Sequence, residues 1–128
     1  MAKKRMFSVD VVDTDDFLNL PTSAQALYFH LGMHGDDDGF MANPKMIMRM
    51  CGCSPKDLAL LISQGFIIAL DRGVIAVRDW MINNDLKNDR YHETIYVAQK
   101  ARLRLDESKR YILVPEADTA CIRSGDGT

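Results

Sequence analysis

The feature of this sequence that most restricts its fold is a change in the spacing of apolar residues at Gly65. The segment before it begins with SPKD at 54–57, which combines a helix-capping serine, a proline suited to the first turn and an acidic residue. Apolar residues then recur at helical spacing, at Leu58, Leu61 and Ile62. The segments after it, FIIAL at 66–70 and VIAVRDW at 74–80, are rich in β-branched and aromatic residues, as strands are. The loop DRG at 71–73 joins them, so the sequence predicts a helix followed directly by a β-hairpin.

A further helix is predicted near the N-terminus. Thr22 and Gln25 have the spacing of a capping box, and the segment HGDDDG at 34–39 ends the helical pattern. Phe40 and Met41 fit a short extended piece after that turn. The expected buried residues of the helix are Ala24, Leu27, Tyr28 and Leu31.

Asn43 before Pro44 is a second start signal, and it predicts a short helix that ends at Gly52. Its expected buried face is Met46, Ile47 and Met50, with Met48 facing outward. Helix, helix, tight turn, helix and β-hairpin in this order are typical of a winged helix. We therefore expect an α+β, mainly helical fold, a winged helix-turn-helix with three helices, a β-hairpin wing and an additional C-terminal helix.

The segment WMINNDLKNDRYHETIY at 80–96 fits no simple period. We expect the second wing strand to continue to Trp80 and Ile82, and Asn83 with Asn84 to form the turn that ends it. A polar connection over 85–90 then leads to a last helix from a Thr94 cap to about residue 105, with Ile95, Ala98 and Leu105 on its apolar side. The run 111–114 either pairs or ends the ordered part. This organisation predicts one domain over 1–112, with a core at about 6–80, an extension at about 81–112 and a disordered tail at 113–128.

Composition excludes several classes of function. The longest apolar runs fall well short of the roughly 20 residues that span a bilayer, and the N-terminus lacks the apolar core of a secretory signal, so we expect no membrane association and a cytoplasmic location. The three cysteines include no second pair for zinc, and Cys51 and Cys53 are too close in sequence for an ordinary bridge. His30 and His34 have metal-ligand spacing, but a polar turn explains the aspartates that follow them. With no phosphate-binding loop and no catalytic motif, we expect no enzyme, no cofactor and no metal.

Charge is unevenly distributed although the net charge is only −2. Residues 6–40 contain seven aspartates and no lysine or arginine, whereas residues 41–110 carry an excess of basic side chains. Segregation of this kind can direct an anionic partner to one face, although solvated surfaces without any partner explain it as well.

Three segments resemble the N-terminal domain of phage replisome organisers, which are similar to DnaD-like replication-initiation proteins. These are DDDGFMANPKMIMRM at 36–50, LALLISQGFI at 58–67 and WMINNDLKNDRYHETIY at 80–96, within a similarity that covers about 3–112. The resemblance implies a non-enzymatic replication-initiation protein of a phage or prophage in a bacterial host. Its implied partners are double-stranded DNA at an origin-like site, helicase-loading proteins and further copies of itself. In the family a further C-terminal region engages the helicase-loading machinery. Since this sequence ends at Thr128, we expect that region to be absent, supplied by another protein, or outside this version of the sequence.

In a winged helix, the third helix enters the major groove and the wing contacts the backbone. We expect the groove face of the third helix to include Asp57 and Ser63 besides the candidates that follow. The candidate DNA-binding residues are Lys45, Arg49, Ser54, Lys56, Gln64 and Arg72, with Lys3, Lys4 and Arg5 as a flexible arm. Lys87 and Arg90 are candidates for contact with a partner. Two alternatives stay open: a transcriptional regulator of the same fold, and an interaction or oligomerisation module that does not touch DNA.

Overall fold

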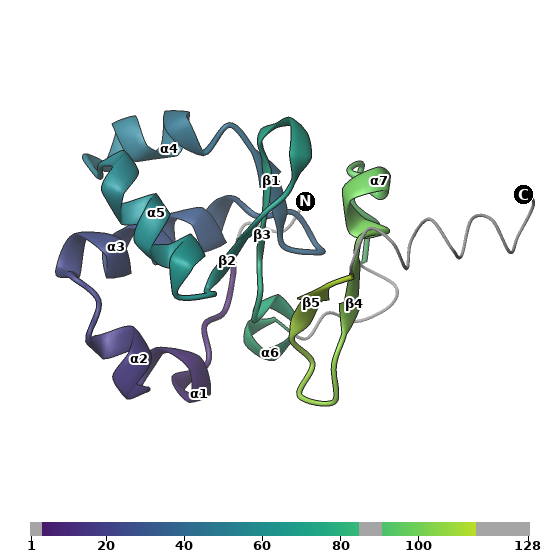
Figure 1. The fold of residues 1–128 in the computed structure, drawn as a ribbon, viewed down its shortest axis with the longest axis horizontal. Helices are drawn as coiled ribbons and strands as arrows, with labels where there is room; N and C mark the ends of the chain where they lie inside the picture. Colours follow the sequence, from purple (N-terminus) through teal and green to yellow (C-terminus); the bar gives the residue numbers. More distant parts are fainter. Residues whose placement is uncertain (1–3, 85–90, 115–128) are drawn as a thin grey trace, which may run out of the picture.

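The computed structural model describes residues 4–84 and 91–114 (Figure 1). The short helices α1 (Val9–Val12) and α2 (Asp15–Leu18) precede the longer helix α3 (Thr22–His34). Strand β1 (Phe40–Ala42), helices α4 (Pro44–Cys51) and α5 (Pro55–Ser63), strand β2 (Ile67–Ala69), the 3₁₀ turn η1 (Asp71–Gly73) and strand β3 (Val74–Val77) follow. The described chain continues with α6 (Trp80–Asn83), α7 (Val97–Lys100), β4 (Leu103–Leu105) and β5 (Tyr111–Leu113). The fold is therefore α+β.

Two small antiparallel sheets connect these elements. In the three-stranded sheet, β3 lies in the centre and pairs with β1 and β2, so that Ile75 stands opposite both Met41 and Ala69. In the second sheet, β4 pairs with β5, with Arg104 opposite Ile112. Figure 1 shows α3, α4 and α5 on one side of the three-stranded sheet and the β4–β5 hairpin on the other. All four residues of β3 are buried, because helices cover one face of the sheet and residues from 91–114 cover the other.

Helix α3 supplies the centre of the core. Its four predicted apolar residues, Ala24, Leu27, Tyr28 and Leu31, are all fully buried, which confirms the predicted face. The aromatic ring of Phe17 packs edge-on against Tyr28 at 5.1 Å and against Phe66 at 5.5 Å, measured between ring centroids. Such edge-to-face pairs add to the free energy of burial, so they fix α2 and β2 to α3.

The predicted buried face of α4 was wrong in part, because the helix is rotated about its axis by roughly one residue from the predicted orientation. Ile47 and Met48 are buried, whereas Met46 and Met50 are 60% and 66% exposed. Adjacent positions on a helix differ by about 100°, so two neighbouring residues can share the inward side when the helix rests on α3. The apolar spacing did not distinguish these two settings, because Met46, Ile47, Met48 and Met50 are all apolar.

The predicted capping box of α3 was also wrong. Pro21 occupies the N-cap position, and no side chain caps the helix there. The side-chain amide nitrogen of Gln25 donates instead to the carbonyl oxygens of Leu20 at 2.9 Å and Leu18 at 3.3 Å. Gln25 therefore satisfies carbonyl groups at the end of α2 and holds α2 against the start of α3.

Residues 80–84 depart from the predicted strand and turn. Strand β3 ends at Val77, and Trp80 begins the helical turn α6 with its side chain buried. The amides of Asn83 and Asn84 accept hydrogen bonds from the backbone N–H groups of Ser8 at 2.8 Å and Met6 at 2.9 Å. These asparagines thus hold the N-terminal segment in place, a role that their turn propensity did not reveal.

The last predicted helix is replaced by other structure. Only Val97–Lys100 is helical, and Leu103–Leu105 forms β4. Thr94 caps no long helix, because its side chain is buried and its hydroxyl donates to the Asp36 carboxylate. Ile95, expected on the buried side, is 83% exposed. The run 111–114, for which pairing and loss of order were both open, pairs with β4. The predicted tail at 113–128 was therefore wrong at its start, because Leu113 belongs to β5, while 115–128 and the connection 85–90 lie outside the described residues.

Candidate nucleic-acid interface

Helix α4 presents two cations on one side. Asn43 has a left-handed backbone conformation with φ of 58°, and Pro44 occupies the first turn, so the chain enters the helix abruptly after β1. Lys45 and Arg49 lie one helical turn apart and both are exposed. Arg49 is in the last turn of the helix, where a positive charge interacts favourably with the helix dipole.

The start of α5 is fixed by a capping box between Ser54 and Asp57. The Asp57 carboxylate accepts the Ser54 backbone N–H at 3.0 Å and the Ser23 hydroxyl at 2.7 Å. These hydrogen bonds, led by the one from the Ser54 N–H, lower the pKa of Asp57 below its ordinary value. Asp57 is buried, so its expected place on the groove face was wrong: it ties α5 to α3. Lys56, beside it, is exposed.

The hairpin between β2 and β3 places a cation at its tip. Leu70 N–H donates to the Val74 carbonyl at 2.8 Å and closes the predicted three-residue loop. Arg72 has φ of 59° and Gly73 has φ of 74°, so the loop turns tightly through two left-handed residues. The Arg72 side chain is exposed, as a phosphate contact from a wing requires.

A hollow of about 690 Å³ lies between α4, α5 and the β2–β3 hairpin, and we call it the α4–α5 hollow. Lys45 and Arg49 line it from α4, and Leu58 and Ile62 line it from α5. Leu58 and Ile62 were expected in the core beside Leu61, but only Leu61 is fully buried. An apolar floor beside exposed cations can contact a thymine methyl group while the cations contact phosphates.

The six candidate residues on the helices and hairpin are all exposed. Ser54 is at the N-cap of α5 and Gln64 is at its C-cap, so these two lie at opposite ends of the helix. Ser63 next to Gln64 donates its hydroxyl to the Leu60 carbonyl at 3.1 Å. The structure brings Lys45 and Arg49 together on α4 and leaves Lys56 and Arg72 on separate elements.

The predicted N-terminal arm does not hold for Arg5. Its side chain is 2% exposed and forms an ion pair with Asp37 at 3.2 Å. A second guanidinium nitrogen donates to the Gly35 carbonyl at 2.8 Å, and the guanidinium lies 5.1 Å from the ring centroid of Trp80. Arg5 is therefore a structural residue rather than a free cation. Lys4 is exposed, whereas Lys3, Lys87 and Arg90 lie outside the described residues.

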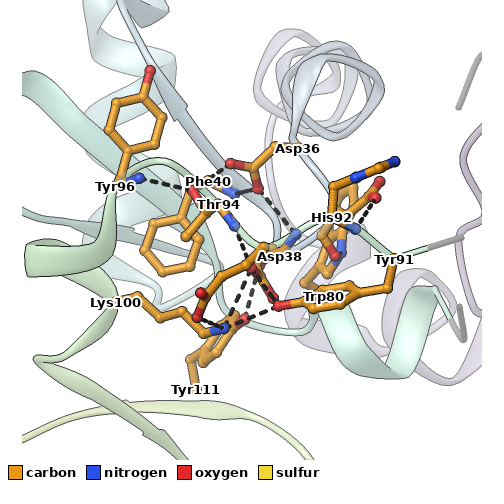
Figure 2. Close-up of polar contacts among 12 residues, drawn as sticks. Asp36, Asp38, Phe40, Trp80, Tyr91, His92, Thr94, Tyr96, Lys100 and Tyr111 are labelled. Carbon is orange, nitrogen blue, oxygen red and sulfur yellow. Dashed lines mark hydrogen bonds and ion pairs between the residues drawn. The ribbon is translucent and has the colours of Figure 1, made fainter. Parts of the chain in front are cut away.

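The structural role of the loop 36–38 was missed at the level of sequence, where it was taken only as a polar turn. We call this loop, with its three aspartates, the acidic loop. The segment that begins at Tyr91 packs against it and is hydrogen-bonded to it (Figure 2). Asp38 is fully buried and accepts hydrogen bonds from the Tyr91 hydroxyl and from the Thr94 N–H at 2.8 Å. Asp37 accepts the His92 N–H at 2.9 Å. The acidic loop thus joins the N-terminal segment, through Arg5, to residues 91–114.

The cation of Lys100 compensates part of this buried negative charge. Its ammonium group lies 3.4 Å from the Asp38 carboxylate, 3.2 Å from Glu93 and 3.0 Å from the Tyr91 hydroxyl. Burial lowers the pKa of Lys100, but the hydrogen bonds to Tyr91 and Glu93 and the charge of Asp38 outweigh that effect and raise it. Burial, followed by the charge of Asp38, raises the pKa of Tyr111, whose hydroxyl donates to the Asp38 carbonyl at 2.8 Å. The cluster is a structural junction in which the polar groups of Asp38, Tyr91, Lys100 and Tyr111 are hydrogen-bonded to one another.

Comparison with known proteins supplies no relative. No protein-family model, no curated protein and no solved structure matches this chain. Among residues 4–84 and 91–114, no helix is long and apolar enough to cross a membrane. The same residues contain no group of three or more histidine, cysteine or acidic side chains that could hold a metal ion.

Proposed function

We propose that residues 22–77 form a winged helix that binds double-stranded DNA through α4, α5 and the β2–β3 hairpin. The order α3, β1, α4, α5, β2, β3 supports this assignment, together with a sheet in which β3 lies between β1 and β2. In such a fold α5 is the helix that enters the major groove, and the hairpin is the wing that contacts the phosphate backbone.

The observation that carries the proposal is the exposure of four cations, Lys45, Arg49, Lys56 and Arg72, on those three elements. Four of the aspartates lie on α1, α2 and their connection, and Figure 1 places these helices at the far end of the helical layer from α4, although Asp71 is exposed beside Arg72 on the hairpin. A charge distribution of this kind orients a polyanion toward α4 and the hairpin.

We further propose that the protein acts in phage or prophage DNA replication initiation, as a replisome organiser in the cytoplasm of a bacterial host. The support is the resemblance of the segments at 36–50, 58–67 and 80–96. Two of these segments contain structural joints: the acidic loop lies in the first, and the asparagines that hold the N-terminal segment lie in the third. Helicase-loading proteins would be the partners of this function. A transcriptional regulator of the same fold is the alternative if the DNA site lies at a promoter.

Fluorescence anisotropy with a labelled duplex tests the DNA contact. The double substitution Lys56→Ala and Arg72→Ala is expected to weaken binding, because each side chain is exposed and each removes one phosphate contact. Arg104→Ala with Lys109→Ala is the matched control, because it also removes two exposed cations, but these lie on β4 and in the loop that follows it, outside the proposed winged helix. Equal losses for both variants would indicate nonspecific attraction to net charge and would reject this surface.

A second candidate function, self-association without DNA contact, is favoured by a different observation. Met46, Met50 and Ile95, which are 60%, 66% and 83% exposed, line a hollow of about 520 Å³ between α4 and the segment 92–96. Exposed apolar groups that surround a hollow are typical of interaction surfaces. If a second copy covers them, sedimentation will show a concentration-dependent dimer, and Met46→Gln with Met50→Gln will shift the protein toward monomer. A protein that stays monomeric at all concentrations would exclude this function.

A further inference from the structure

The turn between α4 and α5 brings two thiols together. The sulfur atoms of Cys51 and Cys53 lie 3.2 Å apart, and both residues are half-buried. A disulfide has a sulfur–sulfur distance of about 2.05 Å, so an approach of roughly 1.2 Å separates the thiols from a covalent bond. The spacing in the sequence argued against an ordinary bridge, but the folded turn changes that expectation.

Gly52 explains why two cysteines so close in sequence face each other. It ends α4 in a left-handed conformation with φ of 75°, and the Cys53 N–H then donates to the Met48 carbonyl at 3.0 Å. The chain therefore folds back between the two cysteines. A Cβ built on Gly52 would meet no atom within 4 Å. The space beside Gly52 is therefore open, and the backbone of the turn can shift into it when the two sulfur atoms approach.

We propose that Cys51 and Cys53 form a reversible intramolecular disulfide by exchange with a small-molecule disulfide. The Cys51 thiolate attacks one sulfur of the small disulfide, giving a mixed disulfide and one released thiolate. The Cys53 sulfur, after losing its proton to solvent, then attacks the Cys51 sulfur and expels the second thiolate. Two protein thiols are oxidised, one small disulfide is reduced to two thiols, and the released thiolates take up the two protons.

The surroundings of Cys53 support this order of attack. Burial, the Cys51 thiol and, to a smaller extent, the charge of Asp57 raise the pKa of Cys53 to about 11, so at neutral pH it is a protonated thiol. Its sulfur also lies 3.4 Å from the Ser23 carbonyl, to which the S–H donates. Cys53 therefore acts as the second, resolving thiol, and oxidation removes its hydrogen bond to α3.

This modification goes beyond the proposed DNA contact and does not depend on it. The bond would lie between the helices that carry Lys45, Arg49 and Lys56, in the turn that sets their relative position. Oxidation replaces the contact between Cys53 and Ser23 by a covalent bond within the turn.

Intact-mass measurement of the full chain tests the proposal, with Cys121→Ser as the parent because the third cysteine would otherwise compete. Incubation of the reduced protein with oxidised glutathione is expected to give a monomer that is lighter by two hydrogens and no longer reacts with a maleimide. Cys51→Ser and Cys53→Ser in the same parent are expected to stop at one bound glutathione, and a reductant should reverse each product.

Two outcomes would overturn the proposal. One is a parent protein that accumulates glutathione on both cysteines, because the thiols would then not reach each other. The other is a parent whose thiols stay fully reactive with the maleimide after a time at which the single-cysteine variants have formed adducts. Circular dichroism of the reduced proteins verifies that each variant is folded, so that a loss of structure is not read as a change in thiol chemistry.

Discussion

Asp38→Asn tests how strongly the acidic loop holds residues 91–114. Asp38 is 0% exposed, and its carboxylate accepts the Tyr91 hydroxyl at 2.6 and 2.7 Å and the Thr94 N–H at 2.8 Å. The Lys100 ammonium lies 3.4 Å from the same carboxylate. The substitution keeps the size of the side chain, removes its charge and replaces one acceptor oxygen by a donor.

The expected loss of stability follows from these contacts. Removing one partner of a fully buried ion pair costs about 3–5 kcal/mol, and a single hydrogen bond to a charged group contributes about 1.5–3 kcal/mol. Lys100 is 29% exposed, so water can solvate its ammonium group once the carboxylate is gone. The remaining oxygen of the asparagine can still accept one hydrogen bond. We therefore expect the free energy of unfolding to fall by about 2–3 kcal/mol.

Equilibrium urea unfolding, followed by far-ultraviolet circular dichroism and by fluorescence of the single tryptophan, measures this change. Trp80 is a suitable probe because its indole N–H donates to the Asp37 carbonyl at 3.0 Å, within the acidic loop. Asp13→Asn is the control, since Asp13 is exposed and its substitution should change stability by less than about 0.5 kcal/mol. Lys100→Met in both backgrounds gives the coupling energy of the pair. A change for Asp38→Asn as small as that of the control would refute the assigned role of the acidic loop.

Four further substitutions probe other joints. Gly39→Ala should lower the free energy of unfolding by about 3 kcal/mol or more, because φ is 86° and the new Cβ would lie 2.5 Å from the buried Trp80 ring. Gly52→Ala should lower it by only about 1 kcal/mol, because φ is 75° but no atom lies within 4 Å of the new Cβ. Similar losses for both variants in thermal denaturation would contradict the steric argument. Arg5→Ala should lower the urea midpoint and leave DNA affinity unchanged, and a large loss of affinity in a folded variant would restore the predicted arm. Because the pKa of Asp57 is lower in the folded than in the unfolded chain, its contribution to stability is present at neutral pH and is lost as pH falls through the folded-state pKa. Asp57→Asn should therefore reduce the fall in the free energy of unfolding at acidic pH. An unchanged fall would contradict this role of Asp57.

Local signals predicted much of the region 40–77. The cap and proline signals at Asn43 and Ser54, the stop at Gly52 and the loop at 71–73 all appear where they were expected. Each depends on the conformational preference of one or two residues, and the surrounding fold does not oppose them. The α+β class followed from these elements together.

Contacts between distant segments could not be predicted from the sequence. The acidic loop was correct as a turn, but its partners come from residues 5 and 91–111, far along the chain. Thr94 has a good helix-capping residue type, yet its hydroxyl and N–H are both used by the acidic loop. Tertiary hydrogen bonds therefore outweigh the capping propensity of Thr94. In the same way, contacts with Asp37 and Trp80 bury the Arg5 side chain, which was predicted to belong to a flexible arm.

The candidate cations were predictable as exposed residues because charged side chains at polar positions of short helices rarely find buried partners. The rotation of α4 was not predictable, and it decides the surroundings of these cations. With Ile47 and Met48 inward, Lys45 and Arg49 line the α4–α5 hollow, while Met46 and Met50 line the hollow beside residues 92–96. Helix α4 thus separates a cationic surface from an apolar one.

The most direct test of the proposed function is the salt dependence of duplex binding. Four exposed cations on α4, α5 and the hairpin predict a slope of about −3.6 in a plot of log affinity against log salt for each subunit, or roughly a 100-fold loss of affinity between about 50 and 200 mM salt. The variant Lys56→Ala with Arg72→Ala should reduce the magnitude of that slope by about 2. Absence of binding at about 50 mM salt with protein in excess, or a slope that the double substitution leaves unchanged, would contradict DNA binding by this surface.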